Sequence, residues 1–126
     1  MEYVGLVTLL LLCQYIVFMG LCGKARVQSG ILAPAMTGDE NFERAYRVQM
    51  NTIEQLIITL PAVWVCAIYF SPMVAASLGL CFFVGRLIYR LSYMSNPDKR
   101  GPGMMIGFVA NLALIGTGLW GLFSAL

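Results

Sequence analysis

The chain has 126 residues, of which 60% are hydrophobic and 11% charged, with a formal net charge of +2 and no histidine. A soluble domain of this size could not bury so much apolar surface, and no basic run suggests nucleic-acid binding. The lack of histidine excludes a histidine general base and most zinc and haem sites, so we expect no metal centre.

The first predicted membrane span runs from Tyr3 to Cys22, and Gln14 is its only strongly polar interior residue. Its hydrophobicity also suits a signal peptide. However, Glu2 stands where such a peptide carries positive charge, and no small-x-small cleavage pattern follows. We therefore expect a retained transmembrane helix, followed by a turn-rich loop from Lys24 to Asn41.

The next two predicted helices share an uncharged run over residues 55–85 that only Ser71-Pro72 interrupts. At 1.5 Å per residue its two parts reach only about 24 Å and about 20 Å, whereas a bilayer core is roughly 30 Å thick. Both helices must therefore extend into charged sequence. We expect them at Phe42–Phe70 and Met73–Met94, as antiparallel neighbours.

A second turn-rich loop is expected at residues 95–103, and the last span at Met104–Ala125. The four spans predict a single all-α integral-membrane domain over residues 1–126, a four-helix bundle. Small and polar residues recur on one face of the last span, which indicates a close helix–helix contact. They are Gly107, Asn111, Gly118 and Gly121.

Lysine and arginine are concentrated near two of the connections. Lys24, Arg26, Arg44 and Arg47 lie between the first two spans, and Lys99 and Arg100 lie between the last two. The turn between spans two and three carries none, and neither do the chain ends. The positive-inside rule then predicts that both basic connections are cytoplasmic and that both termini are non-cytoplasmic.

Two polar faces extend into the membrane from the cytoplasmic end. Arg44, Arg47, Asn51 and Glu54 share one face of the second helix, and Arg86, Tyr89 and Tyr93 share a face of the third. One interpretation is a salt bridge from Glu54 to Arg47 or Arg86 that only fixes packing. The other is a site for a polar, net-negative ligand, because the arginines outnumber the single carboxylate. Glutathione would suit such a site, although the polar faces alone do not single it out.

Arg100 immediately precedes the last span. It is either an ordinary membrane anchor, together with Lys99, or a cation that stabilises an anion such as a thiolate beside a helix N-terminus. Its position alone leaves both interpretations open.

Residues 42–54, Phe-Glu-Arg-Ala-Tyr-Arg-Val-Gln-Met-Asn-Thr-Ile-Glu, resemble the signature of the MAPEG superfamily of membrane-associated eicosanoid and glutathione proteins. The resemblance implies a homotrimer of four-helix subunits, with glutathione as co-substrate held between neighbouring subunits. It also implies a catalytic, thiolate-activating role for Arg100. The implied glutathione-binding residues are Arg26, Arg47, Gln49, Asn51, Glu54, Arg86, Tyr89 and Tyr93.

Within the superfamily the chain is most similar to the branch of microsomal glutathione transferases and the cysteinyl-leukotriene synthase. Three residues, Gln55, Val27 and Leu112, depart from the synthase pattern, and these departures disfavour leukotriene synthesis. The resemblance therefore implies an enzyme that conjugates glutathione to lipophilic electrophiles entering from membrane lipid between the first and fourth helices. A glutathione peroxidase activity on lipid hydroperoxides is a further expectation. The alternatives are a non-catalytic lipid-binding or activating protein of the same superfamily, and a structural or transport bundle.

Overall fold

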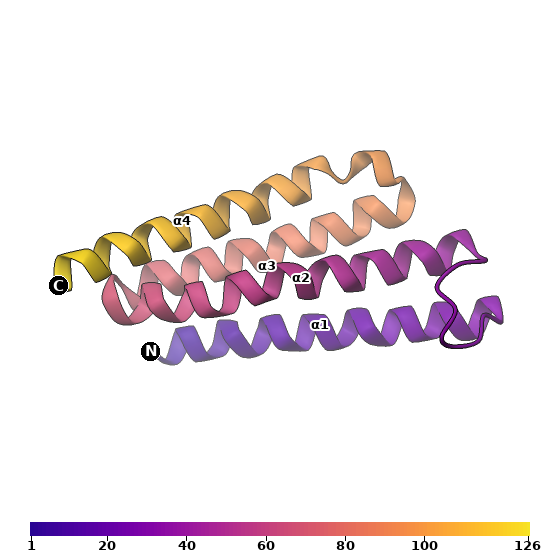
Figure 1. The fold of residues 1–126 in the computed structure, drawn as a ribbon, viewed down its shortest axis with the longest axis horizontal. Coiled ribbons are helices and arrows are strands. Elements are labelled where there is room, and N and C mark those ends of the chain that lie inside the picture. Colours follow the sequence, from indigo (N-terminus) through magenta and orange to yellow (C-terminus); the bar gives the residue numbers. More distant parts are fainter.

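In the computed structural model, which describes residues 1–126, four long helices form an antiparallel bundle (Figure 1). They are α1 (Glu2–Ser29), α2 (Glu40–Tyr69), α3 (Pro72–Ser95) and α4 (Gly101–Ala125), with a short 3₁₀ helix η1 (Pro97–Lys99) before α4. Each of the four is long and apolar enough to cross a membrane. The expected all-α bundle of four spans is confirmed.

The expected end of the first span at Cys22 is wrong, because α1 continues to Ser29. Lys24 and Arg26, which the sequence places in the loop, occupy its last two turns, where cations interact favourably with the helix dipole. Gly30 then ends the helix with φ 74°, a conformation that a residue without Cβ adopts easily. The connection to α2 is therefore shorter than predicted.

The remaining helix ends lie close to their predicted positions, and two of them have side-chain caps. Asp39 accepts a hydrogen bond of 2.9 Å from the Phe42 amide at the start of α2. Ser71 accepts one of 3.3 Å from the Val74 amide at the start of α3. The predicted start of the last span at Met104 is too late, because α4 begins at Gly101, with a proline tolerated in its first turn.

The helices α2 and α3 occupy the middle of the bundle, and α1 and α4 pack against both of them from opposite sides (Figure 1). The expected entry route for lipophilic electrophiles, between the first and fourth helices, is therefore not a groove within one chain. Both termini lie at one end with the α2–α3 turn, and the two basic connections lie at the other (Figure 1). This arrangement fits an even number of spans, and which end faces the cytoplasm stays a prediction.

The small residues of α4 bring it into close contact with α2 and α3, and the stripe predicted such a helix–helix contact. Gly107, Asn111, Gly118 and Gly121 are all buried, and the backbone of Gly121 lies directly against the backbone of Tyr69. Thr59 on α2 donates a hydrogen bond of 2.6 Å to the Asn111 side-chain oxygen. Close backbone approach together with an interhelical hydrogen bond is a usual way to join helices in a membrane.

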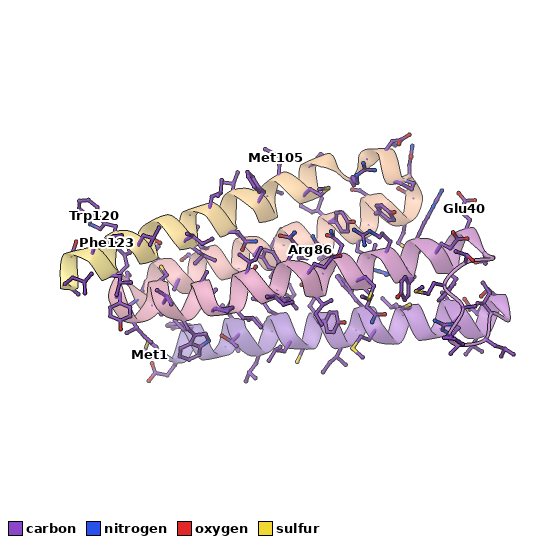
Figure 2. The ribbon with its side chains drawn as sticks, viewed as in Figure 1. Met1, Glu40, Arg86, Met105, Trp120 and Phe123 are labelled. Carbon is purple, nitrogen blue, oxygen red and sulfur yellow. The ribbon has the colours of Figure 1, made fainter.

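The outer surface is apolar along most of the bundle. Large side chains such as Met105, Trp120 and Phe123 point away from it (Figure 2). Trp120 and Phe123 lie with Met1 at the end that carries both termini, where aromatic residues suit a membrane interface (Figure 2). In the interior, by contrast, one charged side chain is buried: Arg86, with 2% of its surface exposed.

Candidate functional site

Arg86 joins α3 to α2 in the interior. Its Nη2 donates hydrogen bonds to Asn51 Oδ1 at 2.8 Å and to Thr52 Oγ1 at 2.9 Å. The centre of its guanidinium lies 4.1 Å from the centre of the Tyr89 ring, a cation–π contact. Its Nε has no partner. The buried charge is thus held only by neutral groups.

Thr52 is a member of this cluster that the sequence analysis missed. It is fully buried, accepts from Arg86, and donates to the Val48 carbonyl at 2.7 Å. Its position one residue from Asn51, at helical spacing from the apolar Val48 and Leu56, could have placed it on the inward face of α2.

Arg47 and Glu54 form an ion pair on the outer edge of the same helix. Their Nη1 and Oε1 atoms are 3.3 Å apart, and the two side chains are 51% and 54% exposed. Glu54 therefore pairs with Arg47 and not with Arg86. It lies about 20 Å along α2 from the start of the helix, so the pair is partly uncovered at membrane depth, where ionised groups are costly.

Tyr93 extends the cluster toward the end that carries the basic connections. Its ring stacks on that of Tyr89, with centroids 5.5 Å apart. Tyr93 and Arg47 both line an open groove of about 580 Å³ between α2 and α3. Arg44 also lines it, and is held by an ion pair with Glu40 and a bond of 2.9 Å to the Met94 carbonyl. The groove is large enough for a small polar ligand.

Arg100 is the residue before the first turn of α4, as expected, and it is exposed. Its Nη1 donates to the Pro97 carbonyl at 3.2 Å, and it has no acidic partner. The start of α4 that follows Arg100 packs against Tyr89, because a Cβ at Gly103 would lie 2.5 Å from the Tyr89 nitrogen. Arg100 thus adds a positive charge to the tyrosine end of the cluster.

Two of the predicted binding residues lie elsewhere. Arg26 donates to the Ala35 carbonyl at 2.8 Å and covers the ring of Phe42 at 4.5 Å. Gln49 donates to the Tyr15 hydroxyl on α1 at 3.4 Å. Because residues 47 and 49 lie on nearly opposite sides of a helix, one chain cannot bring all the predicted residues together. It assembles Arg47, Asn51, Glu54, Arg86, Tyr89 and Tyr93.

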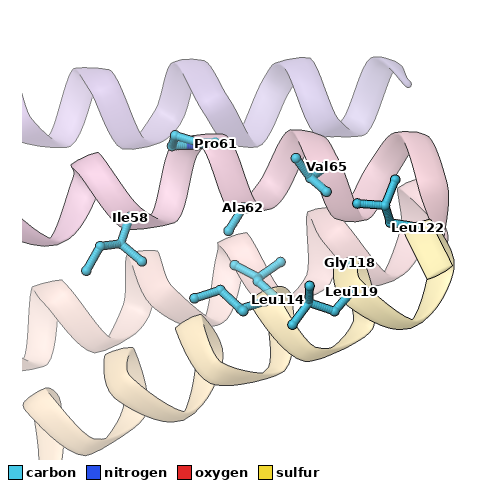
Figure 3. Close-up of a pocket in the computed structure, with 9 residues that line it drawn as sticks. Ile58, Pro61, Ala62, Val65, Leu114, Gly118, Leu119 and Leu122 are labelled. Atoms are coloured by element: carbon cyan, nitrogen blue, oxygen red, sulfur yellow. The ribbon is translucent and has the colours of Figure 1, made fainter.

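A separate apolar groove of about 270 Å³ lies between α2 and α4 (Figure 3). Its lining includes Ile58, Leu114 and Leu119, and no charged residue. Gly118 leaves room for it, because a Cβ there would lie 3.3 Å from the Val65 side chain. Without a polar group to orient a reacting molecule, this groove could hold an apolar molecule but not perform chemistry.

Comparison with known proteins gives a family and several relatives. The family model for the MAPEG family matches residues 4–120. The chain is 41% identical to an uncharacterized protein of Synechocystis sp. over 88% of this chain and 81% of the relative. It is 36% identical to human microsomal glutathione S-transferase 2 over 87% of this chain and 76% of the relative. It is 35% identical to leukotriene C4 synthase of Cavia porcellus over 61% of this chain and 51% of that protein.

Proposed function

The chain belongs to the MAPEG family, and on this premise we propose that it is a membrane-bound glutathione transferase acting on lipophilic electrophiles. The observation that carries the proposal is the excess of positive charge in one cluster. The cluster and its groove contain four arginines, Arg44, Arg47, Arg86 and Arg100, and three carboxylates, Glu40, Glu43 and Glu54, and the interior Arg86 has no anionic partner. The similarity to proteins named glutathione S-transferase and leukotriene C4 synthase supports glutathione as the ligand.

The side chains of the cluster fit the chemistry of glutathione. This tripeptide carries two carboxylates, one ammonium group, two peptide links and a thiol. Arg47 and Arg86 can bind carboxylates, Glu54 can bind the ammonium group, and Asn51 can bind a peptide group. The donor set therefore matches a ligand with one net negative charge.

The site would be completed by a second copy of the chain. Arg26 and Gln49 face away from the cluster, so they would contribute to the site of a neighbouring subunit. The same contact would cover the half-exposed pair of Arg47 and Glu54, which lipid solvates poorly. A homotrimer, as the family resemblance implies, would contain three such sites.

The proposed mechanism places a cation near the sulfur. The free thiol has a pKa of about 8.5, and a neighbouring positive charge lowers that pKa. The Arg100 charge and the Tyr93 hydroxyl would stabilise the thiolate, whose proton passes to water at the open end of the groove. The sulfur then forms a C–S bond with the electrophilic carbon, and the displaced electron pair leaves with the leaving group or takes a proton.

The second substrate would come from the bilayer. Because α1 and α4 lie on opposite sides of one chain, a path between these helices would join two subunits. Reduction of a lipid hydroperoxide by two glutathione molecules, giving an alcohol, water and glutathione disulfide, would use the same thiolate. The competing proposal is a non-catalytic lipid-binding or activating protein, which would not need Arg100.

Ultraviolet absorbance of the thiolate tests the proposal directly. Detergent-purified protein titrated with glutathione at neutral pH should show a saturable rise in this absorbance. S-methylglutathione, which has no ionisable thiol, should bind without the rise. Calorimetric binding of glutathione with no thiolate signal would instead support the non-catalytic alternative.

A further inference from the structure

A second polar site lies near the end with the basic connections, on the flank of the bundle formed by α1 and α3. It is a small cavity of about 170 Å³ whose polar lining consists of Lys24, Gln28, Asn41 and Arg90. None of its lining residues is acidic. None of these four residues takes part in the proposed glutathione chemistry, so two cations are left there without an assigned function.

Arg90 is the more restricted of the two cations. Its Nη1 is buried and has no hydrogen-bond partner, and its guanidinium lies 5.6 Å from the centre of the Phe18 ring. A partly buried guanidinium without an anion is unfavourable, and adding Lys24 at the same cavity increases the positive potential. The cavity therefore favours an anionic group, and a phosphate suits a guanidinium fork well.

An apolar groove of about 270 Å³ adjoins this cavity on the same flank, nearer to the end that carries the termini. Its lining includes Leu10, Val17 and Phe18 from α1, and Phe83 and Leu87 from α3. Phe18 belongs to the groove and is also the ring beneath Arg90. The two depressions are thus consecutive along both helices, one cationic and one apolar.

The length of the combined feature matches one membrane leaflet. Leu10 and Lys24 are fourteen residues apart on α1, which corresponds to about 21 Å. A bilayer with its headgroups is about 40–45 Å thick, so one leaflet measures roughly 20–22 Å. A molecule that filled both depressions would have a phosphate at one end and a hydrocarbon chain along the groove.

We propose that the α1–α3 flank binds one anionic phospholipid, with its phosphate in the Lys24–Arg90 cavity and an acyl chain in the groove below. A zwitterionic lipid is disfavoured, because its own ammonium group would approach the two cations. This lipid is distinct from the lipophilic second substrate. It would occupy the flank of each subunit whether or not glutathione is bound.

Native mass spectrometry tests this proposal with phosphatidylglycerol and phosphatidylcholine of identical acyl chains, supplied in equal amounts to the detergent-purified protein. The wild type should retain phosphatidylglycerol preferentially. Lys24→Gln or Arg90→Gln should each lower that preference about fivefold, and the double variant about 25-fold. Lys99→Gln, which removes a cation at the same end but outside the cavity, should leave the preference unchanged.

Several results would overturn the proposal. Equal retention of both lipids by the wild type, or an unchanged preference in the double variant, would remove the site. Displacement of phosphatidylglycerol by glycerol 3-phosphate or inorganic phosphate would show a soluble phosphate as the occupant. Loss of calorimetric glutathione binding in Arg90→Gln would assign the cavity to the glutathione site. If Arg90→Gln does not fold, Lys24→Gln decides the outcome, because Lys24 is exposed.

Discussion

Arg47 and Glu54 lie two turns apart on α2 and form an ion pair of 3.3 Å, yet about half of each side chain is exposed. In a membrane, an uncovered pair of this kind is costly. It becomes favourable when surrounding groups exclude lipid and supply further hydrogen bonds. We therefore expect a ligand or a neighbouring subunit to cover this pair in the proposed site.

The first prediction concerns this pair. Arg47→Ala or Glu54→Gln should weaken glutathione binding by roughly 2–5 kcal/mol, because each change leaves the other charge unpaired in the covered site. Isothermal calorimetry in detergent measures the effect. Glu2→Gln, which neutralises an exposed carboxylate at the opposite end, is the matched control and should bind normally. Wild-type affinity in both site variants would remove the pair from the site.

The second prediction concerns assembly. Arg26 and Gln49 face away from the cluster formed by the other proposed binding residues, so a site that contained all of them would need more than one subunit. Native mass spectrometry should show three copies of the chain. Mixing an Arg26→Ala chain with a Glu54→Gln chain should restore some binding, because a mixed trimer contains interfaces that have both native residues. A stable monomer that binds glutathione would contradict the interface model.

The sequence predicts the helices better than it predicts their ends. The four spans follow from hydropathy. The charges of Lys24 and Arg26 predict a helix end that is too early, because long cationic side chains on a helix can reach the interface from within it. Gly30, with its positive φ, marks the end of α1.

The candidate site could be predicted only in part. Helical spacing places Arg47, Asn51 and Glu54 on one face, and in the structure Asn51 accepts a hydrogen bond from Arg86. The spacing alone could not show that Glu54 pairs with Arg47 and not with Arg86, because that pairing depends on the rotation of α3 against α2. The spacing also could not predict the contact in which the Gln55 side chain accepts a hydrogen bond of 3.3 Å from Asn111 on α4, since the two residues are far apart in the sequence.

The third prediction concerns topology. Both termini lie at one end of the bundle, and the basic connections lie at the other (Figure 1). The positive-inside rule then predicts non-cytoplasmic reporter tags at both termini and a cytoplasmic tag near Gly30. Reporter fusions that are active on only one side of the membrane measure this. Termini on opposite sides would contradict the four-span structure, whereas two cytoplasmic termini would contradict only the orientation.

The fourth prediction concerns the contact between Gly103 and Tyr89. A Cβ at position 103 would lie 2.5 Å from the Tyr89 backbone nitrogen, so Gly103→Ala must move α4 away from α3. It should lower the free energy of unfolding by about 1–3 kcal/mol, and weaken glutathione binding by displacing Tyr89. Gly116→Ala in the same helix meets nothing within 4 Å, and should be neutral or slightly stabilising. Unfolding in detergent measures both variants, and equal effects would show that the contact is unimportant.

The last prediction concerns Arg100, which separates an enzyme from a binding protein. Arg100→Ala should leave glutathione binding largely intact, because the other residues hold the peptide. The conjugation rate at neutral pH should fall by about 10²–10³, as when one preorganised donor to an oxyanion is lost. The remaining activity should rise with pH and approach the wild type well above the free thiol pKa of about 8.5, where glutathione ionises without help. The conjugation rate of Arg100→Lys should lie between those of the wild type and Arg100→Ala, because lysine keeps the charge and loses the planar fork.

Lys99→Ala, which removes the neighbouring cation, should keep the wild-type rate and pH profile. Unchanged turnover and an unchanged pH profile in Arg100→Ala would make Arg100 a membrane anchor, and thiolate activation would then have to come from another residue.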